Sequence, residues 1–169
     1  MTFADCIRAG GVAVFPADTV YGLACDPGNP EAIARLYELK GRAPTKPSAL
    51  MVFSLDDLPP MPRRARALLP GPVTLLITAS DGATRGIRFP VTELQGPPVL
   101  QSSANHSGGP DARSLADIPQ SIRDGADLVI DGGPLPGTPS TVVDFTVEPY
   151  RIVREGALTA AEVADRLST

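Results

Sequence analysis

The chain has 169 residues, of which 43% are hydrophobic and 20% charged, and its formal net charge at pH 7 is −4. These values are typical of a folded globular protein and exclude a disordered chain, and no apolar run approaches the roughly 20 residues of a membrane-spanning helix. The acidic balance also argues against a large nucleic-acid surface, which needs many contacts between basic side chains and phosphates. A local basic pocket for a small anion remains possible.

The length predicts one domain over residues 1–169, because a chain of this size buries roughly two-thirds of its unfolded surface. The first residues lack a basic start and an apolar stretch, so we expect no signal peptide, no membrane attachment and a cytoplasmic location. Cys6 and Cys25 follow no CxxC or metal-ligand spacing. This favours small buried apolar groups over reactive thiols.

In the first half of the chain, helix signals alternate with short apolar runs. Asn29, Pro30 and Glu31 supply an N-cap, a first-turn proline and a first-turn acid, and Gly41 ends the helix that they open. In chain order the pattern predicts a helix over 2–9, a strand over 12–15, a loop over 16–22, a helix up to 41, a strand over 49–53, a helix over 62–69 and a strand over 73–78.

The second half contains more strands that follow one another directly. Thr159 and Glu162 form a capping box that opens a terminal helix. In chain order the pattern predicts strands at 86–88 and 99–101, a helix from 114 to about 125, strands at 128–130, 141–145 and 150–153, and the terminal helix. The strands at 141–145 and 150–153 form a hairpin or a neighbouring pair. We therefore expect an α/β fold with a mixed, twisted sheet and flanking helices.

Both lysines of the chain, Lys40 and Lys46, lie in one seven-residue loop around Arg42. Lysine offers a compact charge that suits phosphate, and arginine offers a planar fork that grips two oxygens at once. The loop is therefore a candidate anion site. A solvated basic loop is the alternative.

Two further loops follow predicted strands and carry polar side chains. In the loop 16–23, Thr19 is a candidate ligand contact, whereas Asp18 is equally well explained as a cap of its own turn. The loop 102–109 offers small residues and donors for phosphate or ribose oxygens, among them Ser103 and Asn105, without a Walker or GxGxxG pattern.

Several single residues have an ordinary explanation as well as a functional one. His106, the only histidine, has no second histidine for a metal site, and no GxSxG elbow supports a serine nucleophile beside it. Arg88, Arg151 and Arg154 each lie beside a predicted strand and could pair with a surface acid, which is the usual fate of an arginine.

The chain carries, in this order, the segments PADTVYGL (16–23), KGRAPTKPSALMV (40–52), LPGPVTLLI (69–77), GIRFP (86–90), SSANHSGGP (102–110), STVVDF (140–145) and RIVREGAL (151–158). Together they resemble the signatures of the YrdC-like family of threonylcarbamoyl-AMP synthases over nearly the whole chain. The resemblance implies the YrdC-like fold with a concave ligand-binding cleft. It also implies the short, single-domain form, without the extra C-terminal domain of longer relatives.

The resemblance implies that L-threonine, bicarbonate or CO2, and ATP give threonylcarbamoyl-adenylate and pyrophosphate, for modification of an adenosine in tRNA. ATP is then a substrate with Mg2+ beside it, and a tRNA-modifying transferase complex takes the product. The implied ATP contacts are Lys40, Arg42, Lys46, Thr84, Ser103, Asn105 and Arg154. The implied threonine contacts are Thr19, Met51, Arg88, Gln101 and Ser140. Catalysis rests on positioning and on neutralising charge by Lys40, Arg42 and Lys46, with no protein nucleophile and no protein metal ligand assigned.

Two positions depart from the family pattern. Ala17 stands where a threonine is common, and Met51 stands where many relatives carry a histidine, so Met51 is expected as a pocket wall. Two alternatives therefore stay open. One is a non-catalytic nucleotide- or RNA-binding module with weak tRNA binding, and the other is a related carbamoyl-transfer enzyme.

Overall fold

The computed structural model describes residues 1–43 and 48–169, so the predicted contact of Lys46 with ATP lies outside the described residues. Its strands are β1 Ala13–Pro16, β2 Tyr21–Cys25, β3 Ala49–Met51, β4 Val73–Thr78, β5 Thr84–Arg88, β6 Val99–Ser103, β7 Leu128–Val129, β8 Thr141–Asp144 and β9 Arg151–Arg154. Within the described residues they form one sheet in the order β7-β1-β2-β6-β3-β5-β4-β8-β9. The pairs β1/β7, β3/β5 and β4/β8 are parallel, and the other neighbours are antiparallel.

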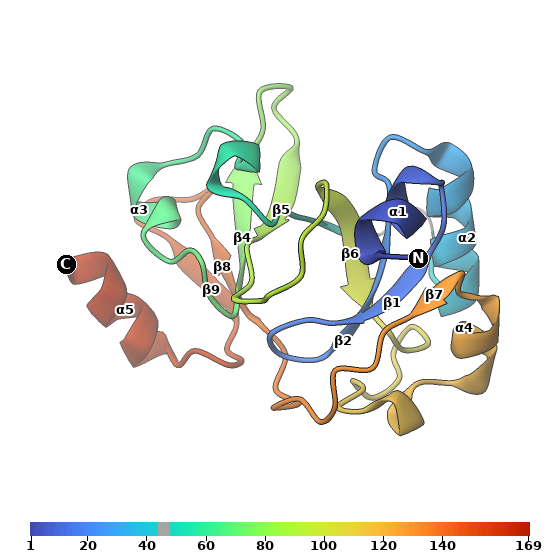
Figure 1. The fold of residues 1–169 in the computed structure, drawn as a ribbon. Coiled ribbons are helices and arrows are strands. Elements are labelled where there is room, and N and C mark those ends of the chain that lie inside the picture. Colours follow the sequence, from blue (N-terminus) through green and yellow to red (C-terminus); the bar gives the residue numbers. More distant parts are fainter. Residues whose placement is uncertain (44–47) are drawn as a thin grey trace.

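The helices flank this sheet, as Figure 1 shows. They are α1 Phe3–Arg8, α2 Pro30–Lys40, α3 Arg63–Arg66, α4 Gln120–Gly125 and α5 Ala160–Ser168, with single 3-10 turns η1 Leu55–Asp57 and η2 Leu115–Asp117. The predicted α/β fold with a mixed sheet and flanking helices is confirmed. No helix in the described ranges is long and apolar enough to cross a bilayer.

Helix ends follow the capping chemistry of the sequence. The Asn29 side chain accepts hydrogen bonds from the backbone amides of Glu31 and Ala32, and Gly41 ends α2 in the left-handed region at φ 60°. Thr159 and Glu162 form the predicted capping box at the start of α5. These ends are local, so sequence alone could predict them.

Two predictions of secondary structure were wrong. The loop predicted over 16–22 includes Tyr21 and Gly22, but residues Tyr21–Cys25 form β2, in which every residue is buried. A strand buried on both faces loses the alternation that marks a strand in sequence. The helix predicted over 114–125 is a 3-10 turn followed by α4, because Pro119 interrupts it and serves as the N-cap residue of α4.

The half of the sheet around β1 and β2 has a core on each face. Val14 and Leu23 pack toward α2 and α4, in a cluster that includes Leu36 and Ile122. Ala13, Phe15 and Ala24 pack toward α1, in a cluster that includes Phe3 and Met51. This half is therefore covered on both sides.

The half around β4 and β8 has a core on one face only. Val73, Leu75 and Ile77 alternate along β4 and pack with Val143, in a cluster that also holds residues of α3 and α5. The intervening Thr74 lies on the opposite face of the sheet. Thr74 and Val142 on this second face line a cleft.

Candidate active site

A cleft of about 230 Å3 opens where the two halves of the sheet meet. Seven of the residues predicted from sequence line it: Thr19, Arg42, Arg88, Gln101, Ser103, Ser140 and Arg154. This volume lies below the ~300–1,000 Å3 of sites for drug-sized ligands, so the enclosed part suits a group the size of an amino acid.

Strand alternation sets the lining of the cleft. Ile87 points into the core, so the next residue of β5, Arg88, points to the opposite face. In β6, Gln101 is paired with Ala49 of β3, and both line the cleft. Residues far apart in the sequence therefore converge because they share one face of one sheet.

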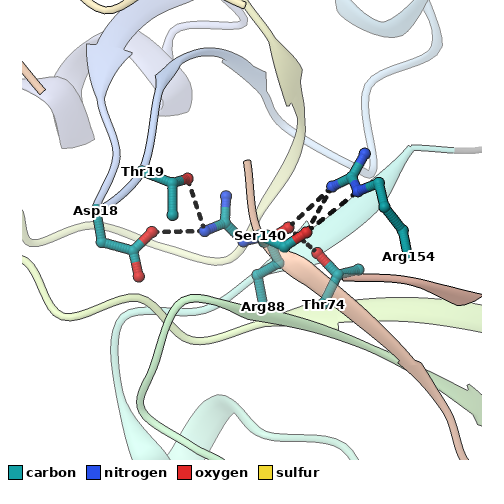
Figure 2. Close-up of polar contacts among 6 residues, drawn as sticks. All are labelled: Asp18, Thr19, Thr74, Arg88, Ser140 and Arg154. Atoms are coloured by element: carbon teal, nitrogen blue, oxygen red, sulfur yellow. Dashed lines mark hydrogen bonds and ion pairs between the residues drawn. The ribbon is translucent and has the colours of Figure 1, made fainter. Parts of the chain in front are cut away.

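Arg88 lies at the centre of this polar group, as Figure 2 shows. Its Nη2 forms an ion pair with Oδ1 of Asp18 at 2.5 Å and lies 3.5 Å from Oγ1 of Thr19. The side chains of Arg88 and Asp18 are only 5% and 9% exposed. Two atoms of the pair, Asp18 Oδ2 and Arg88 Nε, are buried and have no hydrogen-bond partner among the described residues.

Burial changes the pKa of both members of this pair. Burial raises the pKa of Asp18 above its usual value, and the attraction of Arg88 only partly opposes this. Burial also lowers the pKa of Arg88, with Asp18 opposing the shift and the nearby charge of Arg154 adding to it. An arginine stays charged at any physiological pH, so the cleft contains a buried permanent cation with one carboxylate partner.

Opposite Asp18, Ser140 joins Thr74 and Arg154 (Figure 2). The hydroxyl oxygens of Thr74 and Ser140 are 2.7 Å apart. Arg154 donates from Nε and Nη2 to the carbonyl oxygen of Ser140, at 3.2 and 2.7 Å. A side chain at Gly156 would clash with the backbone of Pro139, so glycine allows the chain after β9 to approach the start of β8.

The half-buried Arg42 enters the cleft from the end of α2. Its Nη1 donates to the hydroxyl of Ser102 at 3.3 Å. Asp111, also half-buried, lines the cleft as well. The described lining thus carries three guanidinium groups and one carboxylate, an arrangement that suits a ligand with several negative charges.

Lys40 does not line this cleft, although it borders it from behind. It is 2% exposed. Its Nζ donates to the carbonyl oxygens of Ser103 and Asn105, at 2.5 and 2.9 Å, and to Oδ1 of Asn105 at 2.8 Å. Burial lowers the pKa of Lys40 to about 8, with the charge of Arg42 adding to the shift and Asp111 opposing it. Lys40 therefore holds the 103–105 loop in shape.

Asn105 belongs to the same support. Its Oδ1 also accepts from the Ser103 hydroxyl at 2.7 Å, and its Nδ2 donates to the carbonyl oxygens of Gly109 and Pro110. The side-chain amide is thus used within the loop. Neither Lys40 nor Asn105 lines the cleft, so the geometry does not favour a direct contact of either residue with ATP.

Two other predicted residues lie elsewhere. Thr84 is exposed at the start of β5, paired with Thr78 at the far end of the β4/β5 hairpin. Met51 is fully buried in the apolar cluster beneath α1, so it is a core residue and not the expected wall of the pocket. Sequence order could not separate these positions from the cleft, because only strand direction and register decide which end and which face a residue occupies.

Several lining residues had not been predicted. Thr74 has a readable signal, a hydroxyl at an alternate position of a mainly apolar strand. Ser102 belongs to the predicted 102–109 loop but is not among its named contacts, and Asp111 has no signal. Asp18 had been weighed as a turn cap, and its ion pair with Arg88 crosses 70 positions of sequence. His106 is exposed and bonds Ser121 at the surface. No group of three or more His, Cys, Asp or Glu side chains that could hold a metal occurs in the parts of the chain that the structure covers.

Comparison with known proteins identifies related chains. The Sua5_yciO_yrdC family, described as "Telomere recombination", matches residues 5–156. A threonylcarbamoyl-AMP synthase of Pyrococcus abyssi is 30% identical, over 93% of this chain and 54% of that protein. A threonylcarbamoyl-AMP synthase of Pseudomonas paraeruginosa is 34% identical, over 82% of this chain and 88% of that protein.

A solved structure shares the fold. The crystal structure of P. abyssi Sua5 complexed with L-threonine superposes with a TM-score of 0.86 at 30% identity, over 96% of this chain and 55% of that one. The chain therefore spans about half the length of these Pyrococcus relatives.

Proposed function

The chain belongs to the Sua5/YciO/YrdC family, and from this premise we propose that it is a threonylcarbamoyl-AMP synthase. It would combine L-threonine, bicarbonate or CO2, and ATP into threonylcarbamoyl-adenylate and pyrophosphate. The observation that carries the proposal is the cleft itself, in which Arg42, Arg88 and Arg154 converge with hydroxyl side chains. Its charge complements a carboxylate and a chain of phosphates. The relatives named threonylcarbamoyl-AMP synthase supply the substrate class.

The threonine end of the site is the buried one. Arg88 receives the α-carboxylate, because a guanidinium is the group best suited to bind two carboxylate oxygens. Thr19, Gln101 and Ser140 surround it and offer partners for the hydroxyl and amine of threonine. L-Threonine bound to P. abyssi Sua5 supports this choice of ligand.

The nucleotide end is the cationic one. Arg42, Arg154 and Ser103 contact the phosphates, and Lys46 is proposed to join them from the loop after α2. Lys40 and Asn105 act from behind by fixing the backbone that presents Ser103. Thr84 and Met51 have no part in the proposed site, because they lie at a distant hairpin and in the core.

The chemistry requires no protein nucleophile. The threonine amine adds to the carbon of CO2 and loses a proton, giving a carbamate. A carbamate oxygen then attacks the α-phosphorus of ATP in line, the bond to the bridging oxygen breaks, and pyrophosphate leaves. Fixed guanidinium groups accelerate this step by holding the reactants and by neutralising charge on the phosphates.

Mg2+ accompanies ATP in this proposal. The ion usually binds through one or two carboxylates together with substrate phosphates. Asp111, which lines the cleft, would supply the carboxylate. The charge of the ion would offset the negative charge of the leaving pyrophosphate.

The product is an activated mixed anhydride, so a tRNA-modifying transferase complex is the proposed recipient, and the cytoplasm is the proposed location. Weak tRNA binding is the alternative proposal for the same surface. It is separable from synthesis, because its affinity would fall steeply with salt.

The test is release of pyrophosphate by the purified protein, together with mass detection of threonylcarbamoyl-adenylate. Release should require ATP, L-threonine and bicarbonate together, and L-serine should replace threonine poorly. Carbamoyl phosphate offered in place of bicarbonate separates a carbamoyl-transfer enzyme. Pyrophosphate release that ignores threonine would contradict the proposal.

A further inference from the structure

We propose that Asp18 is a positioning residue, which holds the Arg88 guanidinium in the orientation that receives the carboxylate of the amino-acid substrate. This inference rests on the proposed function and deepens it. Asp18 is not itself among the residues that line the cleft, whereas Arg88 is. Asp18 therefore acts through Arg88 and does not touch the substrate.

The contact is specific and enclosed. One terminal nitrogen of Arg88, Nη2, is occupied by Asp18 Oδ1 and lies near the hydroxyl of Thr19. Nη1 makes no hydrogen bond to any described residue, and Arg88 lines the cleft. A guanidinium fixed on one nitrogen keeps its other donors at a set angle. This is what binding of a planar carboxylate requires.

The pair is poorly arranged for stability. Buried polar atoms are nearly always hydrogen-bonded, and an ion pair stabilises the interior only when its remaining donors and acceptors are satisfied. Here one oxygen of Asp18 and Nε of Arg88 are buried and unpartnered among the described residues. An ion pair that leaves such atoms unpaired adds little to stability, which favours a role in holding the Arg88 side chain in place.

Asp18 also compensates the charge of Arg88 beside the cleft. Arg42 and Arg154 line the same cleft as Arg88, and the charge of Arg154 reaches Arg88. A buried guanidinium without a counter-ion would be strongly unfavourable, and neighbouring cations would push it away. The Asp18 carboxylate keeps Arg88 in place before the substrate arrives.

The experiment compares Asp18→Ala and Asp18→Asn with wild type, and uses Asp144→Asn as the matched control. Asp144 also pairs with an arginine and is buried, but it does not line the cleft. The readouts are KM for L-threonine, KM for ATP and kcat in pyrophosphate release, together with L-threonine binding by calorimetry.

Asp18→Ala should raise KM for threonine about 10- to 100-fold, the range of a lost hydrogen bond to a charged group, and leave KM for ATP within about twofold. Asp18→Asn keeps the side-chain oxygen and should recover part of the loss. Asp144→Asn should change neither constant. In an Arg88→Ala background, adding Asp18→Ala should lower kcat/KM by less than about twofold, because the two residues act as one unit.

Other results would contradict the role of Asp18 or the proposed function. Wild-type KM for threonine in both Asp18 variants, with an active wild type, overturns this inference and leaves the proposed function intact. Equal losses for threonine and ATP, or full additivity with Arg88→Ala, would show general damage and also overturn it. If Asp18→Ala does not fold, the isosteric Asp18→Asn decides alone. A wild type that neither binds threonine nor releases pyrophosphate overturns the proposed function, and this inference with it.

Discussion

Two aspartate–arginine pairs in this protein have similar contacts and opposite surroundings. Asp18 and Arg88 meet at 2.5 Å beside the cleft, and both side chains are nearly excluded from solvent. Asp144 and Arg151 meet at 2.7 Å across the β8/β9 pair, where Asp144 is buried but the Arg151 side chain is 65% exposed.

The difference lies in the hydrogen bonds around each carboxylate. Oδ1 of Asp144 accepts from the backbone amide and the hydroxyl of Thr146, and Oδ2 accepts from Arg151. These bonds lower the pKa of Asp144, led by that from the Thr146 hydroxyl. Burial raises the pKa of Asp18, whose Oδ2 has no partner among the described residues. The comparison teaches that hydrogen bonding to the carboxylate, more than the ion pair, separates a structural site from one arranged for a ligand.

The largest expected effect comes from removing each arginine. Arg88→Ala should lower kcat/KM for threonine by about 100- to 1,000-fold, because it removes the carboxylate partner and leaves a buried anion facing the cleft. Arg151→Ala should leave kcat/KM within about twofold and change the free energy of unfolding by under about 1 kcal/mol, because the Arg151 side chain is largely exposed to solvent. Steady-state kinetics and denaturant unfolding of both variants measure this contrast. Similar losses of kcat/KM in the two variants would contradict the predicted difference between the two pairs.

A second prediction concerns stability. Replacing both members of the cleft pair by apolar residues of similar size, Asp18→Leu with Arg88→Met, should leave the free energy of unfolding unchanged or raise it by about 1–4 kcal/mol. The same protein should bind no threonine. Asp144→Ala should lower the free energy of unfolding by about 2 kcal/mol, because three donors lose their acceptor. A double variant much less stable than wild type would indicate that the cleft pair is structural.

Lys40 extends the comparison to a buried cation without a carboxylate partner in hydrogen-bond contact among the described residues. Its ammonium group donates to the carbonyl oxygens of Ser103 and Asn105. Its pKa of about 8 means that the ammonium is lost between about pH 7 and pH 9. The affinity for ATP should fall several-fold over this range, as the 103–105 loop loses a donor and the site loses a charge. Titration of ATP at each pH measures the change, and in Lys40→Gln the affinity should not vary with pH across it.

Unfolding does not explain such a loss. The folded pKa of Lys40 lies below the ordinary value of 10.5. The unfolded chain therefore binds more protons between these two values, and the contribution of Lys40 to stability rises with pH there. A melting temperature that fell in parallel with the ATP affinity would contradict this explanation.

The smallest expected effect is the response to acid. Since the pKa of Asp144 is lowered in the fold, its stabilisation is present above the ordinary pKa and is lost as pH falls through the folded value. The raised pKa of Asp18 has the opposite sign, so protonating it favours the fold. Melting temperatures between about pH 3 and pH 6 should therefore decline less steeply in Asp144→Asn than in wild type, and more steeply in Asp18→Asn.

Local chemistry made some elements readable from sequence. The ends of α2 and α5 follow from Asn29, Gly41 and Thr159, whose capping bonds span only a few residues. β2 was missed because its burial on both faces removes the alternating pattern. The predicted helix over 114–125 is interrupted because Pro119 outweighs the apolar spacing around it.

The residues of the candidate site also divide into those that the sequence predicts and those that it does not. The order of the seven segments sufficed to predict the family and seven of the residues that line the cleft. It could not assign Met51 to the core or Thr84 to a distant hairpin end, because strand register decides the face and the end at which each residue lies.

The amino-acid sequence by itself determined which side chains were available: two lysines close together, scattered arginines and hydroxyls after strands. The tertiary structure alone decided their partners. In the fold, the buried Lys40 donates hydrogen bonds to the 103–105 loop, and Asp18 forms an ion pair with Arg88. Burial and hydrogen-bond partners set the charge and orientation of a group, and both depend on contacts between segments that are far apart in the chain.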